Sequence, residues 1–269
     1  MAKKTKESFL IAQLSDLHFG DPRFDRDLMG TTINEINDAL PDLVVIPGDL
    51  TTDGYREQFQ EAKSYLDEIR CPQTVVIAGN HDCRNVGFLH FEDIFGPRYY
   101  TSTYQFGVCC GGKPQEEIRV VAADSTKPDI NDGEIGRDKY GWIFEELDDA
   151  ERFKVFVLHH HLVSIPGTGR ERNIVWDAGD VLAELRRAKV DLILAGHKHV
   201  PYAWPIGGML AITSGTASTW RTRGYTQPSY NLIRIGPEQV EVTIKTPGKK
   251  GSMESFPRRS TGEIETSVS

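Results

Sequence analysis

The chain has 269 residues, of which 26% are charged and 39% hydrophobic, and its formal net charge at pH 7 is −8. This length can bury a sizeable core within one large α/β domain, and the composition is typical of a soluble globular protein. The negative charge disfavours non-specific binding to nucleic acid, which needs a basic surface, but bound metal ions would still allow a small anionic substrate.

The start of the sequence does not have the pattern of a signal peptide. Residues 1–8 are basic and polar, and the apolar stretch 9–14 is too short for the core of such a peptide. The chain has no run of about 18 apolar residues, so we expect no membrane-spanning helix. Its four cysteines form no Cys-x-x-Cys pair, which favours reduced thiols. Together these features predict a cytoplasmic protein.

Short apolar runs rich in β-branched residues recur along the chain, with the length of buried strands. They are 9–14, 43–46, 74–78, 118–123, 153–158, 192–195 and 209–213. Apolar residues at helical spacing lie between some of these runs, in the stretches 33–40, 59–69, 136–150 and 181–188. This alternation of strands and helices indicates α/β layering.

The last third of the chain has a different pattern. The stretches 230–235 and 239–246 alternate around a Gly-Pro-Glu sequence at 236–238, which predicts a hairpin. Beyond residue 247 the sequence is mostly polar. We therefore expect one domain over residues 1–247, followed by a polar tail over residues 248–269 that is disordered or loosely docked.

Seven of the eight histidines lie in four short motifs at the ends of apolar runs, and a Gly-Asp pair ends a fifth run. In open α/β sheets, ligands bind beyond the carboxyl ends of the strands, so we expect all five motifs to meet at one rim. The motifs are Asp16-Leu17-His18, Gly48-Asp49, Gly79-Asn80-His81-Asp82, His159-His160-His161 and Gly196-His197-Lys198-His199.

Carboxylate, imidazole and amide groups suit divalent first-row metals such as Mn, Fe, Co, Ni and Zn. One Asp can bridge two ions about 3.5–4 Å apart, and such ions make a hydroxide available at neutral pH because they lower the pKa of bound water. A single motif of this kind most often marks a turn or a structural histidine. The five together favour a dinuclear site that hydrolyses phosphate esters.

The five motifs in this order resemble the pattern of the calcineurin-like metallophosphoesterases. That pattern is Asp-x-His, Gly-Asp, Gly-Asn-His-Asp/Glu, a histidine after a strand, and Gly-His-x-His, and here it extends over residues 16–199. The resemblance implies a four-layer α/β/β/α sandwich of two mixed β-sheets flanked by helices, and it makes residues 1–247 a metallophosphoesterase domain. The compact spacing within residues 79–82 and 159–161 is most similar to bacterial cyclic-nucleotide and glycerophosphodiester phosphodiesterases.

The resemblance also implies a metal ligand set for two ions, with Asp49 as the bridge between them. The ligands of the first ion are Asp16, His18 and His199. The ligands of the second ion are Asn80, His159 and His197.

His81 would face the substrate, stabilise the developing charge and protonate the leaving oxygen. Asp82 would orient His81. The family often has an acidic or amide residue three places after the bridging Asp, where this chain has Thr52.

Two assignments keep an alternative. The ligand of the triple-histidine motif is His159 or, in the second interpretation, His160, which otherwise contacts substrate, while His161 is structural. Arg84 is a substrate-binding candidate, with an ordinary surface arginine as the alternative. Arg221 and Arg223 form a further candidate rim of the site.

We therefore predict a phosphodiesterase of the cyclic-nucleotide or glycerophosphodiester type, with two metal ions and a metal-bridging hydroxide as nucleophile. Mn and Fe are favoured as the metals, with Zn, Co and Ni as alternatives. The alternative functions are a phosphomonoesterase or nucleotide pyrophosphatase, and a catalytically inactive scaffold of the same fold. We expect a small phosphoester as partner, no membrane and no nucleic acid, and we leave a homodimer open.

Overall fold

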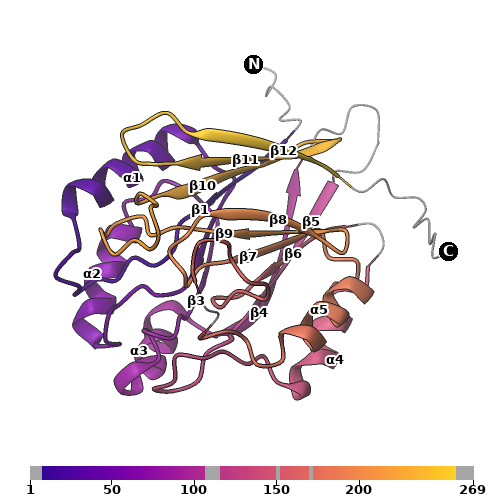
Figure 1. Ribbon diagram of the computed structural model, residues 1–269, viewed down its shortest axis with the longest axis horizontal. Helices are drawn as coiled ribbons and strands as arrows, with labels where there is room; N and C mark the ends of the chain where they lie inside the picture. The colour runs from indigo at the N-terminus through magenta and orange to yellow at the C-terminus, as the bar shows by residue number, and fades with distance from the viewer. Residues whose placement is uncertain (1–7, 107–115, 150–151, 170–171, 259–269) are drawn as a thin grey trace.

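Two six-stranded mixed β-sheets pack face to face, and helices cover the outer face of each (Figure 1). The computed structural model describes residues 8–106, 116–149, 152–169 and 172–258. In spatial order, the first sheet contains β12 (Ser252–Pro257), β11 (Gln239–Lys245), β10 (Tyr230–Ile235), β1 (Phe9–Gln13), β2 (Leu43–Pro47) and β3 (Thr74–Ile77). The second sheet contains β4 (Tyr99–Phe106), β5 (Glu116–Ala123), β6 (Phe153–Val157), β7 (Leu192–Ala195), β9 (Met209–Thr213) and β8 (Tyr202–Ile206).

The helices form two groups at opposite sides of the molecule (Figure 1). One group packs on the first sheet and consists of α1 (Arg26–Ala39), α2 (Arg56–Leu66) and α3 (Gly87–Phe95). The other packs on the second sheet and consists of α4 (Arg137–Leu147) and α5 (Ala178–Arg187). The arrangement confirms the predicted four-layer α/β/β/α sandwich of two mixed sheets.

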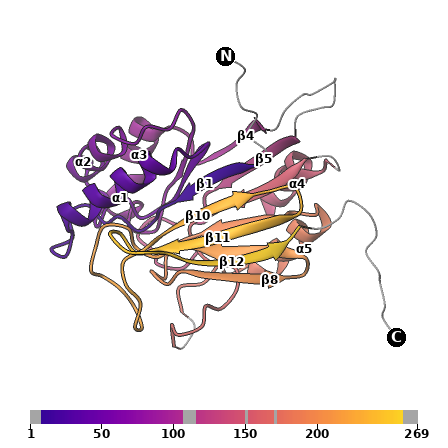
Figure 2. The same ribbon diagram turned by 90° about the horizontal axis from the view of Figure 1, so that it is seen from above.

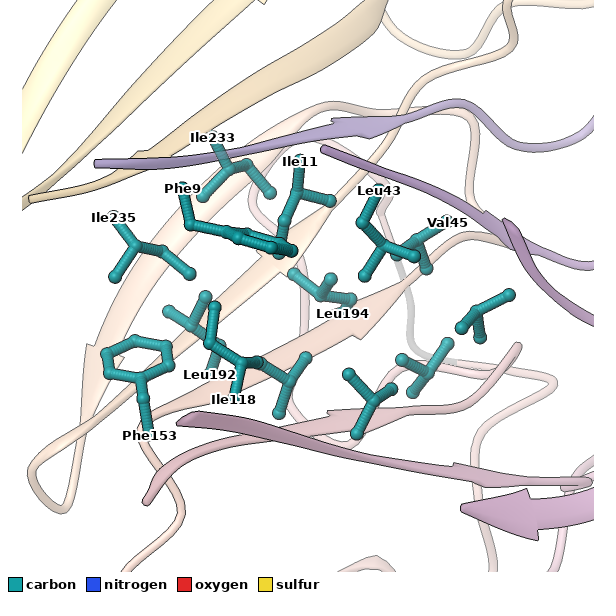
Figure 3. Packing of buried hydrophobic residues seen from close by; sticks show 14 of the residues in the cluster. Phe9, Ile11, Leu43, Val45, Ile118, Phe153, Leu192, Leu194, Ile233 and Ile235 are labelled. Carbon is teal, nitrogen blue, oxygen red and sulfur yellow. The ribbon is translucent and has the colours of Figure 1, made fainter. Parts of the chain in front are cut away.

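The main core fills the space between the two sheets (Figure 3). Along β1, Phe9 and Ile11 point into this core, whereas Ala12 packs in a separate core with the helices of the first sheet. Successive side chains of a strand point to opposite faces, so a strand that is buried on both faces is apolar throughout. This is why the central strands appear in the sequence as continuous apolar runs.

The central strands of both sheets are parallel. β1, β2 and β3 pair in parallel, and so do β5, β6, β7 and β9. Parallel pairing brings the carboxyl ends of neighbouring strands to the same edge. The five motifs follow β1, β2, β3, β6 and β7, so they all lie at that edge of their sheets.

Several predicted elements are confirmed with small shifts of their ends. All seven predicted strands exist, β7 and β9 with the predicted bounds, and the predicted hairpin is the antiparallel pair β10 and β11. Leu40 differs from the prediction, because it does not share the buried face of α1 with Ile33 and Ile36. It ends the helix with left-handed backbone (φ 51°), and its side chain is 68% exposed.

The sequence did not predict the strands β4, β8 and β12, the α-helix α3 or the short 3₁₀ helix Arg84–Val86. The three strands are edges of their sheets. An edge strand is exposed along one side and carries polar residues, so it lacks the apolar run that marks a buried strand. In β8, for example, Pro205 stands at an edge position, where a strand tolerates the missing N–H group.

The polar tail expected over residues 248–269 is wrong in its first part. Residues Ser252–Pro257 form β12, which pairs with β11 along its whole length at the edge of the first sheet (Figure 2). Backbone hydrogen bonds to β11 hold this mostly exposed strand, and Phe256 packs against the core between the sheets. The remainder, 259–269, lies outside the described residues, so for it the tail stays a prediction.

No helix in the described part of the chain is both long enough and apolar enough to cross a membrane.

Candidate metal centre

The loops that carry the motifs lie directly against one another. The backbone N–H of Asp16 donates to the carbonyl of Gly48 at 3.1 Å, and that of His18 donates to the carbonyl of Asp49 at 3.0 Å. A Cβ at Gly79 would lie 2.2 Å from Oδ1 of Asp49. Only glycine fits between these loops, so their close packing requires Gly79 as the first residue of the third motif.

Left-handed backbone is concentrated at the motifs. A positive φ is uncommon for a residue with a side chain, although Asp, Asn and His adopt it more readily than most. The strain of such residues collects at functional sites and persists because the surrounding structure holds them in place. The motif residues other than glycine with a positive φ are Asp16, His18, Asp49, His197 and His199.

The first cluster contains Asp16, His18, Asp49 and His199, all almost completely buried. Nε2 of His18 lies 3.0 Å from Nε2 of His199 and 3.7 Å from Oδ2 of Asp49, and Nε2 of His199 lies 3.2 Å from Oδ1 of Asp16. Nδ1 of His199 donates to the carbonyl of Arg221, because a carbonyl oxygen can only accept. The lone pair of His199 is therefore on Nε2 and points into the cluster, as metal binding requires.

The second cluster contains Asn80, His159 and His197. Oδ1 of Asn80 lies 3.1 Å from Nε2 of His159 and 2.9 Å from Nδ1 of His197, and these two nitrogens are 3.2 Å apart. Nδ1 of His159 donates to the carbonyl of Pro47 at 2.7 Å, so Nε2 is the nitrogen that faces the cluster. One amide oxygen and two imidazoles thus converge on a single point, which suits a first-row divalent metal.

Asp49 belongs to the first cluster and also borders the second. Its Oδ1 is 3.4 Å from Nε2 of His159, and its Oδ2 faces His18. Burial raises the pKa of Asp49, but the neighbouring His159 and His81 outweigh it and hold that pKa well below its usual range. Burial lowers the pKa of His159, but the charge of Asp49 outweighs this and raises it to about 9. The protein alone therefore buries an ion pair between the Asp49 carboxylate and protonated His159. A metal cation could take the place of the His159 proton.

The triple-histidine motif separates into three environments. His160 lies within reach of the second cluster, beside His159 and His197. Both of its ring nitrogens, however, have protein partners: Nδ1 lies 2.9 Å from Oγ of Ser125, and Nε2 donates to the carbonyl of Asn131 at 3.1 Å. The ring of His161 stacks on that of His197. This geometry favours His159 over His160 as the ligand.

The ring of His81 lies beside the first cluster, with its centroid 4.7 Å from that of His18. Its Nδ1 donates to the carbonyl of Thr52 at 2.7 Å. Burial lowers the pKa of His81. With Nδ1 held in this way, Nε2 is the ring atom left to act on a substrate.

The predicted contact of Asp82 with the ring of His81 is wrong. The Asp82 carboxylate instead accepts backbone N–H bonds from Gly79, Leu50 and Thr51, at 2.8, 3.0 and 2.8 Å. Through these bonds Asp82 ties the second motif to the third. Burial, together with the charge of Asp49, raises the pKa of Asp82 to about 7.

Asn131 is a site residue that lies in none of the motifs. Its Oδ1 accepts hydrogen bonds from Nδ2 of Asn80 and Nη2 of Arg84, each at 3.2 Å. The hydrogen bond between Asn80 and Asn131 turns the amide of Asn80 so that its Oδ1 faces the second cluster. A lone asparagine in a loop carries no pattern from which the sequence could have identified it. Arg84 also donates to the carbonyl of Thr52, so it supports the loops around His81.

The comparisons with known proteins agree on the family. The family model described as calcineurin-like phosphoesterase matches residues 9–201. A probable cyclic nucleotide phosphodiesterase of Synechococcus is 28% identical over 200 residues, which are 70% of this chain and 72% of the relative. The glycerophosphodiester phosphodiesterase GpdQ of Enterobacter lignolyticus is 26% identical over 211 residues, or 71% of this chain and 70% of the relative.

Solved structures share the fold at low sequence identity. GAP50 of Plasmodium has a TM-score of 0.75 at 14% identity and covers 95% of this chain and 90% of its own. A dimetal phosphatase of Danio rerio has a TM-score of 0.66 at 15% identity and covers 94% of this chain and 99% of its own. With the family model matching residues 9–201, the protein belongs to the calcineurin-like phosphoesterase family and is a phosphoester hydrolase.

Proposed function

We propose that the protein is a phosphodiesterase with a dinuclear metal centre. The proposed ligands are Asp16, His18 and His199 for one ion, Asn80, His159 and His197 for the other, and Asp49 as the bridge. The observation that carries the proposal is the orientation of the Asp49 carboxylate, whose two oxygens face different clusters. When bound, the two ions would supply a bridging hydroxide as nucleophile and neutralise charge on the phosphoryl oxygens.

His81 is the proposed acid of the reaction. The carbonyl of Thr52 holds Nδ1 at 2.7 Å and so fixes the plane of the ring beside the first cluster. In the imidazolium form, with Nδ1–H donated to Thr52, the proton on Nε2 would pass to the leaving oxygen as its bond to phosphorus breaks, which prevents the departure of an unstable alkoxide. The same N–H group would stabilise negative charge on the phosphoryl group before that step.

The diester preference rests on the names of the relatives. Both curated relatives described above are named as phosphodiesterases, one for cyclic nucleotides and one for glycerophosphodiesters. A small phosphodiester of one of these two types is therefore the proposed substrate. Mn and Fe are the proposed metals, and the cytoplasmic location and the homodimer stay predictions.

An activity screen after metal stripping tests the proposal. The stripped protein is reloaded with Mn, Fe, Co, Ni or Zn, and turnover is compared on bis(p-nitrophenyl) phosphate and p-nitrophenyl phosphate. We expect two ions per chain and faster turnover of the diester, followed by hydrolysis of cyclic nucleotides or glycerophosphodiesters. A preference for the monoester would replace the proposal with a phosphomonoesterase, and a protein that binds no metal would be a scaffold.

A further inference from the structure

The loop after β9 brings Arg221 to the side of the site on which His81 lies. Nη2 of Arg221 is 3.4 Å from Nε2 of His81, and Nη1 is 3.5 Å from Nδ1 of His18. The carbonyl of the same residue holds Nδ1 of His199. Arg221 therefore touches the proposed acid and two proposed ligands, and its side chain is 26% exposed, so its guanidinium borders both the site and solvent.

Asp21 orients the guanidinium of Arg221 without neutralising the local charge. Oδ2 of Asp21 lies 3.6 Å from Nη1 of Arg221, and the side chain of Asp21 is 3% exposed. Both oxygens of this carboxylate already accept hydrogen bonds from Arg23, at 3.0 Å each. One buried carboxylate is thus shared by two arginines, which leaves a net positive charge beside the site.

The two contacts of Arg221 with imidazole nitrogens are weak. At 3.4 and 3.5 Å they are longer than the about 2.7–3.2 Å of a normal N–H hydrogen bond. A charged phosphoryl oxygen would bind a guanidinium at about 2.7–2.9 Å and so replace them. Arg84 differs, because its guanidinium already donates to the carbonyl of Thr52 and to Asn131.

We propose that Arg221 is a substrate-binding residue that holds a non-bridging oxygen of the phosphoryl group beside His81. This inference rests on the proposed function and names the protein group that grips the anionic end of the substrate. An oxygen bound to Nη2 would lie next to Nε2 of His81, so the same contact would align the leaving group with the acid. The planar guanidinium offers paired donors that match two phosphoryl oxygens, which an ammonium group does not.

The variants Arg221→Gln and Arg221→Lys test this role, with Arg234→Gln as the matched control. Arg234 lies on β10 opposite Leu10, near the amino end of β1, and its side chain is 46% exposed, so its substitution makes the same charge change at the end of the sheet away from the motifs. The measurements are KM and kcat on bis(p-nitrophenyl) phosphate, the inhibition constant of inorganic phosphate, metal content and melting temperature. Inorganic phosphate serves as a probe that binds without turnover.

For Arg221→Gln we expect KM and the inhibition constant of phosphate to rise by about tenfold to a hundredfold, the range for loss of hydrogen bonds to a charged group. Arg221→Lys should fall between this variant and the wild type, because the lysine keeps the charge but not the paired donors. Arg234→Gln should stay within twofold of the wild type. All variants should keep two metal ions per chain, since the carbonyl that holds His199 is unchanged.

Two results would overturn the role of Arg221. In the first, Arg221→Gln keeps the KM and phosphate inhibition of the wild type. In the second, both Arg221 variants lose metal together with phosphate binding, which would mean that the residue acts through His199. A wild-type protein that neither hydrolyses the diester nor binds phosphate would instead overturn the proposed function itself, and this inference with it.

Discussion

At the scale of single residues, Asp49 connects every part of the site. Its carboxylate faces His18 with one oxygen and His159 with the other, and Oδ1 also accepts the backbone N–H of His81 at 2.9 Å. One side chain thus contacts both clusters and fixes the loop of the proposed acid. The charge of this buried carboxylate raises the pKa of His159, whose Nε2 lies 3.4 Å from its Oδ1.

Replacing Asp49 by Ala should abolish both metal binding and activity. We expect both ions to be lost and turnover on bis(p-nitrophenyl) phosphate to fall by about 10²–10³-fold or more, because nucleophile and charge stabilisation disappear together. Metal content per chain and turnover are the measurements. Asp53→Ala, four residues further on, is the control, and full activity of Asp49→Ala would disprove the bridging role.

Replacing His81 by Asn should separate chemistry from metal binding. We expect kcat to fall by about 10²–10⁴-fold, the usual contribution of a positioned acid, while the metal content stays at that of the wild type. The reason is that Nδ1 of His81 binds the carbonyl of Thr52 and the ring stands beside the ligand clusters. His90→Asn, at the one histidine outside the motifs, is the control. Loss of metal from the His81 variant would instead show that His81 is a metal ligand.

At the scale of elements, the site depends on loops that are held by side chains outside the ligand set. Asp82 ties the loop after β2 to the loop after β3 through three backbone N–H groups. Asn131 ties the loop after β5 to Asn80 and, through its carbonyl, to His160. Partners of this kind fix the orientation of metal ligands and commonly change metal affinity by about 10–100-fold when they are removed.

Asn131→Ala should weaken the second metal site by about 10–100-fold, because the amide of Asn80 then turns freely. Titration of metal-stripped protein with Mn would show one unchanged and one weakened binding step. Asn131→Asp keeps the accepting oxygen, so it should retain the affinity of the wild type. Two unchanged binding steps in Asn131→Ala would remove this residue from the metal centre.

At the scale of the whole molecule, three cores stabilise the four layers. The core between the sheets collects apolar side chains from both, and each outer core joins one sheet to its helices. β12 extends the first sheet and places Phe256 opposite Val240, where the phenyl ring packs against the edge of the core between the sheets. This strand therefore contributes to stability, although its residues are distant in sequence from the five motifs.

Phe256→Ala should destabilise the protein without changing its chemistry. Truncating a fully buried Phe usually costs about 3–5 kcal/mol, and Phe256 is only partly buried, so we expect about 2 kcal/mol. Thermal and urea unfolding measure this loss, while kcat and metal content should match the wild type. Met253→Ala, on the same strand with a 61% exposed side chain, is the control. Equal stability of the two variants would show that β12 is not docked on the core.

The sequence alone determined the layered α/β fold and the groups that meet at the site. Its apolar runs mark strands that are buried on both faces, and a parallel sheet brings the residues after such strands to one edge. That reasoning finds buried strands and misses edges, since β4, β8 and β12 are stabilised by pairing rather than by continuous burial. For the same reason, the sequence analysis assigned residues 252–257, which form the edge strand β12, to a polar tail.

Only the tertiary structure decided how the site residues are oriented. Asp82 proved to hold backbone N–H groups rather than His81, and both nitrogens of His160 proved to be engaged by Ser125 and Asn131. Asn131 and Arg221 come from loops distant in sequence, and their roles arise from contacts of about 3 Å across the molecule. Spacing along a chain encodes which edge of a sheet a residue reaches, whereas hydrogen-bond direction depends on partners that only the folded chain brings together.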